Sequence, residues 1–148
     1  MNSAPDSTLH HLPGASFWRR FLALNYDLLL VAALLFVATA GAMLVHGGPV
    51  DPTSPLFRLY LLLVTWAFFV GFWSHGGQTL GMKSWRLRVT KRDGSPLGWN
   101  RASLRFLAAL ATPGIGMLWC LVDRDRQGLY DRIAGSRCVV LPKGLPER

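Results

Sequence analysis

The stretch LLLVAALLFVATAGAMLV, residues 28–45, decides the fold because none of its 18 side chains carries a charge. Extending it back to Phe21 gives 25 mostly apolar residues, interrupted by Asn25 and Asp27. An α-helix rises about 1.5 Å per residue, and about 20 apolar residues cross the hydrocarbon core of a bilayer. Residues 21–45 are therefore predicted to form a membrane-spanning helix.

A second apolar stretch covers residues 56–75 and follows a short connection rich in glycine and proline. Ser54 and Pro55 favour a helix start, because a serine oxygen can accept from free amides and proline suits the first turn. The glycine pair at 76–77 is typical of a helix end. Two apolar helices joined by a short turn predict an antiparallel transmembrane hairpin.

The charges indicate how this hairpin is oriented. Apolar residues make up 51% of the chain and charged residues only 16%, yet the net charge is +8. The basic residues lie beside the apolar runs, a pattern that favours a lipid bilayer as partner over nucleic acid. Basic residues flank both ends of the hairpin, so the positive-inside rule places both ends, including the N-terminus, in the cytoplasm. These flanking residues are Arg19, Arg20, Lys83, Arg86, Arg88, Lys91 and Arg92.

A third apolar region at about 99–122 has a helical period that breaks at Pro113. Arg101 and Arg105, four residues apart, are predicted to lie on the polar side of this helix. The uncharged part, 106–122, is short for a straight crossing. We expect a broken helix that enters the membrane and returns, and a third span is the alternative left open. The apolar stripe consists of Leu104, Leu107, Ala108 and Ala111, at positions i, i+3, i+4 and i+7.

Two β-prone runs, 85–90 and 137–141, are predicted to pair into a small cytoplasmic sheet. The fold class is therefore an all-α membrane protein, with a transmembrane hairpin, a broken third apolar helix that is re-entrant or a third span, and a small β element. The expected boundaries are a flexible cytoplasmic tail at 1–16, one membrane domain at 17–141 and a second tail at 142–148.

Motifs for catalysis, cofactors and metals are incomplete. The segment 76–84 approaches a phosphate loop, but Met82 separates the glycine from the lysine, so we interpret it as an interfacial turn. Residues 123–134 open like a calcium loop, but Ala134 replaces the closing glutamate. No enzyme chemistry, cofactor or metal is predicted, and Cys120 and Cys138 are expected to be unpaired thiols. The interfacial turn comprises Gly77, Gln78, Gly81 and Lys83.

Asp27 is the most informative candidate for function. A central aspartate costs about 2.5–3.5 kcal/mol in a spanning helix, so such residues usually face protein or water. Arg20 lies on nearly the same face, but the two are about 10 Å apart along the helix axis and are not expected to pair tightly. A structural role, holding the cytoplasmic helices against the hairpin, is the alternative to transport.

The chain resembles the RDD family of bacterial membrane proteins between about residues 15 and 141. The resemblance rests on FWRR at 17–20, Asp27, GQTLGMK at 77–83 and GLYDRIAGS at 128–136. The family is named for an arginine and two aspartates, which correspond here to Arg20, Asp27 and Asp131. Tyr130 stands where the family commonly has histidine.

The resemblance implies a multi-pass protein of the bacterial inner membrane. Transport has been suggested for the family, and some of its members have been linked to sodium–proton exchange. We hypothesise that Asp131 folds back to pair with Arg20. The first functional hypothesis is transport of a small ion or ligand. The transported species would be a proton or a monovalent cation, and Asp27 would be its site. It requires a homo-oligomer or a membrane partner protein, since two spans enclose little space. The alternative is a non-transporting module that scaffolds or regulates a partner.

Overall fold

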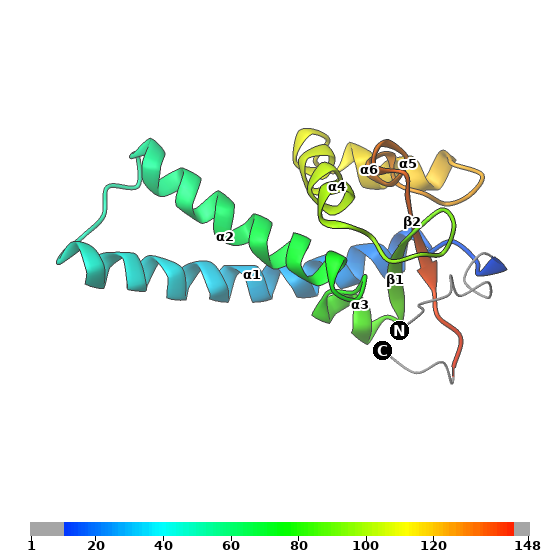
Figure 1. The fold of residues 1–148 in the computed structure, drawn as a ribbon, viewed down its shortest axis with the longest axis horizontal. Coiled ribbons are helices and arrows are strands. Elements are labelled where there is room, and N and C mark those ends of the chain that lie inside the picture. Colours follow the sequence, from blue (N-terminus) through cyan, green and yellow to red (C-terminus); the bar gives the residue numbers. More distant parts are fainter. Residues whose placement is uncertain (1–10, 144–148) are drawn as a thin grey trace.

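The computed structural model of the chain describes residues 11–143. Figure 1 shows two long helices extending together as a hairpin, with the shorter elements gathered around the N-terminal end of the first. The helices are α1 (Phe17–His46), α2 (Pro55–Ser74), α3 (Leu80–Ser84), α4 (Trp99–Ala111), α5 (Ile115–Val122) and α6 (Leu129–Ala134), and the strands are β1 (Leu87–Lys91) and β2 (Ser136–Val140).

Both hairpin helices are long and apolar enough to cross a membrane. Helix α1 begins four residues before the predicted span and ends at His46, where the following Gly47 adopts a left-handed φ of 77°. Helix α2 has nearly the predicted bounds, with Pro55 in its first turn. The expected side-chain cap by Ser54 is wrong, because only its backbone carbonyl accepts, from the amide of Arg58 at 3.1 Å.

The burial pattern of α1 divides the helix into two halves. Its buried residues are Arg20, Ala23, Asp27 and Val31, which share one face of the first half. In the second half, Phe36 is 76% exposed and Leu44 is 83% exposed. Apolar surface of this extent is stable in contact with lipid rather than water. The exposed half of α1 therefore supports the membrane assignment.

Helices α4 and α5 meet at an angle of 98°, across the predicted break at Pro113. At about 1.5 Å per residue, their 13 and 8 residues rise about 20 Å and 12 Å, short of the bilayer core of about 30 Å. The pair therefore does not form one straight third span.

The leucines of the apolar stripe of α4 face outward, and Arg105 faces inward. Leu104 and Leu107 are exposed, whereas Arg105, which was predicted to lie on the polar side of the helix, is buried. Within a bilayer the lipid accepts leucine side chains, so the interior is left for the residue that needs polar partners.

Strands β1 and β2 pair in antiparallel register, with Val89 opposite Cys138, which confirms the predicted pairing. Strand β1 starts two residues late because Arg86 has a left-handed φ of 55°. Gly14 and Ala15 extend this layer, through a bridge to Val139 and an amide bond to the Cys138 carbonyl at 3.0 Å. These two residues belong to the folded part, although the predicted tail reached residue 16. Residues 1–10 and 144–148 of the predicted tails lie outside the described residues.

The hydrophobic core lies where the base of the hairpin meets α4 and the strands. It consists of Ala15, Ala23, Val70, Trp73, Met82, Leu87, Val89, Leu97, Ala102, Phe106 and Cys138. This core fixes the N-terminal half of α1, and with it Arg20 and Asp27, against the elements that follow the hairpin.

Candidate functional site

The carboxylate of Asp131 is fully buried between two guanidinium groups. Arg20 in α1 places Nη1 2.5 Å from Oδ2 of Asp131. Arg105 in α4 places Nη2 2.8 Å and Nε 3.0 Å from Oδ1. The expected pairing of Arg20 with Asp131 is present, and Arg105 joins it without having been predicted. We call Arg20, Arg105 and Asp131 the charged cluster, which links α1, α4 and α6.

The surroundings of Asp131 hold its carboxylate ionised. Asp131 lies three residues after Gly128, the residue that precedes α6, and Oδ2 accepts the Gly128 amide at 3.1 Å. Burial raises the pKa of the Asp131 carboxyl, but the positive charges of Arg105 and Arg20 outweigh burial and hold that pKa below its usual value. Asp131 is therefore a fixed negative charge near neutral pH and is poorly suited to exchanging protons.

Arg20 is also bonded to backbone from three other segments. Its Nε donates to the Ala15 carbonyl at 3.2 Å, and Nη2 donates to the carbonyls of Arg126 at 2.8 Å and Cys138 at 3.5 Å. A planar guanidinium with several fixed donors suits such a crosslink. Arg20 therefore connects α1 to the N-terminal extension, the loop before α6 and β2.

Arg105 lies against two aromatic rings. Its guanidinium carbon is 4.4 Å from the centre of the Trp73 ring and 4.9 Å from that of Tyr130, within the range of cation–π attraction. Tyr130, the departure from the family pattern, thus contacts the charged cluster. The sequence signal for Arg105 was its place at the edge of the uncharged run that begins at residue 106.

Asp27 is held by neutral donors from the turn after the hairpin. The Thr79 hydroxyl donates to Oδ2, and the Gly81 amide donates to Oδ1 at 2.9 Å. Within residues 11–143, no arginine or lysine nitrogen lies within 4.0 Å of this carboxylate. The structure therefore separates Asp27 from the charged cluster and leaves its negative charge without an ion pair there.

The turn that holds Asp27 is largely buried. Gly77, Gln78 and Gly81 are buried, while Lys83 is exposed. Gln78 donates to the Leu87 carbonyl at 2.7 Å, and the Gly77 carbonyl accepts the Val89 amide at 2.6 Å. Three of the four residues predicted for an interfacial turn therefore pack α3 against α1 and β1.

A cavity of about 720 Å³ lies between α1, α2, α4 and α5. Ligand pockets span about 300–1,000 Å³, so the cavity is large enough for a small ligand or several waters. Most of its lining is apolar. The charged side chains that reach it are Arg20, Asp27 and Arg105. We call it the interhelical cavity, and it gives Asp27 access to a space beyond its fixed partners.

Comparison with known proteins gives matches at the level of sequence. The model of the RDD family matches residues 14–135, a range that contains Arg20, Asp27 and Asp131. The chain is 36% identical over 80 residues to the uncharacterized protein RP437 of Rickettsia prowazekii (strain Madrid E), and the aligned region covers 51% of this chain and 43% of RP437. It is 28% identical over 141 residues to the uncharacterized protein YckC of Bacillus subtilis (strain 168), and the aligned region covers 90% of this chain and 89% of YckC. No solved structure gives a significant match.

Proposed function

This chain belongs to the RDD family of membrane proteins, and from that premise we propose that it transports a proton or a monovalent cation through Asp27. The observation that supports this is the setting of the Asp27 carboxylate. It is buried in a helix long enough to span the membrane, lines the interhelical cavity and has only neutral donors as partners. A charge buried without an ion pair is costly, and binding a proton or cation removes that cost.

The charged cluster has a different part in this proposal. Its two arginines and one aspartate sum to one positive charge, and both guanidinium groups bind the Asp131 carboxylate. Asp131 is held ionised, so the exchangeable position is assigned to Asp27 alone. We propose that the cluster anchors the cytoplasmic ends of α1 and α4 while the ion exchanges at Asp27.

The proposed setting is a bacterial inner membrane with both hairpin ends in the cytoplasm. Helices α4 and α5 would enter the inner leaflet and return, in keeping with their bend of 98°. Two spans enclose little space, and Val70 and Trp73, the buried residues of α2, carry no charge. We therefore propose that the ion path is completed by a second copy of the chain or by a membrane partner protein.

The orientation gives the first test. A cysteine at Gly48 is expected to react with a membrane-impermeant maleimide in intact cells, since a side chain there meets no atom within 4 Å. A cysteine at the exposed Asp93 should react only after permeabilisation. The wild type serves as the background control, because both native cysteines are buried. The reverse labelling pattern would contradict the proposed topology.

The transport proposal is tested by Asp27→Asn in proteoliposomes. The amide keeps the shape of the side chain but cannot exchange a proton, so pH-dependent flux should fall to the level of empty liposomes while the melting temperature changes little. Asp51→Asn is the matched control, because Asp51 is also bonded to neutral groups, those of Thr53, but lies exposed between the hairpin helices. Equal flux in wild type and Asp27→Asn would exclude Asp27 as the transport site.

A second candidate function is a non-transporting module that scaffolds or regulates a partner protein. The saturated contacts of Arg20 and Asp131 favour it, because they are those of a structural crosslink. In this case the wild type carries no ion in liposomes, alone or as an oligomer, and Asp27→Asn lowers stability or partner association instead. Flux in the wild type would exclude this alternative.

A further inference from the structure

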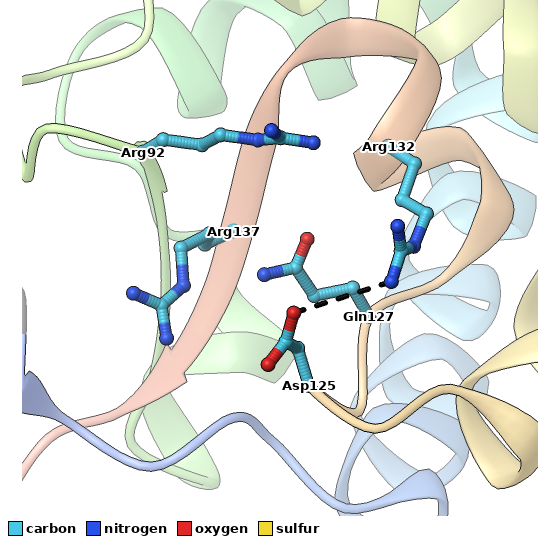
Figure 2. Close-up of a pocket in the computed structure, with 5 residues that line it drawn as sticks. All are labelled: Arg92, Asp125, Gln127, Arg132 and Arg137. Carbon is cyan, nitrogen blue, oxygen red and sulfur yellow. Dashed lines mark ion pairs between the residues drawn. The ribbon is translucent and has the colours of Figure 1, made fainter.

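The interhelical cavity and a smaller pocket beside the strands differ in how their acidic side chains are paired. Figure 2 shows the smaller pocket, of about 250 Å³, in which Nη2 of Arg132 lies 4.0 Å from Oδ2 of Asp125. In the interhelical cavity the carboxylate is that of Asp27, whose partners among residues 11–143 are neutral donors. A ligand of the interhelical cavity can therefore supply the positive charge that the protein does not place beside Asp27.

The two arginines that reach the interhelical cavity already have partners. Arg20 uses all three of its side-chain nitrogens in bonds to Asp131 and to backbone carbonyls. Arg105 binds Asp131 through two nitrogens and lies against the rings of Trp73 and Tyr130. An anionic ligand would compete with Asp131 for these guanidinium groups, whereas a cationic ligand meets a carboxylate that has no ion pair. The pairing therefore favours a cation as the ligand.

The size and the walls of the interhelical cavity call for more than a bare ion. Its volume is about 720 Å³, whereas one water occupies only about 30 Å³. The lining runs from Phe17 to Leu28 on α1 and from Leu62 to Trp73 on α2, which is about 16 Å along the hairpin at about 1.5 Å per residue. Apolar walls bind apolar groups, because removing such groups from water is favourable. The ligand is therefore expected to carry an apolar body beside its charge.

The interhelical cavity is open at the surface of the molecule. Leu28, Leu110 and Leu118 line it from three helices, and they are 51%, 53% and 50% exposed. A compound with an apolar body enters a bilayer and can reach the cavity between these helices. We infer that the interhelical cavity binds an amphiphilic organic cation, with an ammonium group at Asp27 and an apolar body along the hairpin. This inference rests on the proposed function, because it gives the monovalent cation at Asp27 a chemical class.

The test measures the melting temperature of the purified full chain in a non-ionic detergent at pH 7, since a ligand that binds the folded state stabilises it. The probe is hexylammonium, an amine that is charged at pH 7 as lysine is. Methylammonium has the same charge without the apolar body, and 1-hexanol has the body without the charge. Hexylammonium should raise the melting temperature and bind at least about tenfold more tightly than either comparison compound.

Each comparison compound can overturn the inference. Equal binding of 1-hexanol would show an apolar space that any chain fills, including the tail of a lipid. Equal binding of methylammonium would show that the charge acts alone. Hexanoate has a similar body and the opposite charge, and stabilisation by hexanoate as large as that by hexylammonium would show that the arginines select the ligand instead of Asp27.

Two variants locate the ammonium group and the apolar body. Asp27→Asn should abolish the advantage of hexylammonium over 1-hexanol, and an advantage that persists would overturn the inference. Asp51→Asn is the matched control, because Asp51 is exposed and lies outside the cavity. Ala109→Leu adds volume to a lining residue of α4, so it should weaken hexylammonium more than methylammonium. Ala111→Leu in the same helix is exposed and outside the lining, and it should bind both probes as the wild type does.

The binding measurements are made at equilibrium and without an ion gradient, so their outcome is separate from that of transport. A wild type that carries ions at Asp27 but does not prefer hexylammonium keeps the proposed function and overturns this inference. A wild type that binds hexylammonium at Asp27 but shows no flux keeps the assigned ligand class and overturns transport.

Discussion

Replacing Asp131 by alanine is expected to lower the free energy of unfolding in detergent by about 3–5 kcal/mol, which is a large share of the stability of a small domain. The change leaves the guanidinium groups of Arg20 and Arg105 buried without their shared carboxylate. It also removes the acceptor for the Gly128 amide at the start of α6. The effect can be measured by chemical unfolding or, where too little protein folds, by the yield of folded protein.

A double-mutant cycle distinguishes this explanation from a general loss of packing. Arg20→Ala should also destabilise the protein, and Arg20→Ala combined with Asp131→Ala should cost clearly less than the two single changes together. Additive costs would show that the two charges do not interact. Asp125→Ala is the matched control, because Asp125 is 67% exposed and loosely paired with Arg132. An exposed pair of this kind contributes at most about 1 kcal/mol.

The hairpin was predictable because its signal is local. The run 28–45 is apolar throughout, so the prediction of a spanning helix needs no knowledge of which face is buried. The same holds for the break at Pro113 and for the β-prone character of the two runs that form β1 and β2. The burial of Arg105 was not predictable in this way, because the apolar stripe of α4 says only which residues share a face. In a membrane the lipid also accepts that stripe, so periodicity alone does not say which face is inside.

The partners of Asp27 depend on contacts between segments far apart in the chain. Thr79 and Gly81 are 52 and 54 residues away, and they reach Asp27 only because the turn after α2 folds back onto α1. The glycine-rich segment 76–84, which resembles a phosphate loop, was the sequence signal for this contact. In the structure, its Gly81 packs closely against α1. Arg20 and Asp131 were paired correctly because Arg20 needed a partner and Asp27 was too far along the same helix to supply it.

Gly81→Ala is predicted to have a large effect although the residue carries no charge. An added Cβ would lie 2.3 Å from the Ala23 carbonyl oxygen and 2.9 Å from Oδ1 of Asp27. The carbonyl belongs to the backbone of α1 and cannot move by itself, so α3 must shift away. Overpacking costs about 1–3 kcal/mol, and losing the amide bond to a charged Asp27 costs about 1.5–3 kcal/mol more. We therefore expect a total destabilisation of about 2.5–6 kcal/mol.

Chemical unfolding in detergent tests this prediction, with Gly71→Ala in α2 as the matched control. An added Cβ at Gly71 meets no atom within 4 Å, and alanine is the better helix former by about 1 kcal/mol. Gly71→Ala should therefore be neutral or slightly stabilising. If Gly81→Ala behaved in the same way, α3 would not rest on α1 and the Gly81 amide would not hold Asp27. If Gly81→Ala is destabilised as expected while Asp27→Asn is not, the close approach of the two backbones, rather than the charge of Asp27, holds the turn in place.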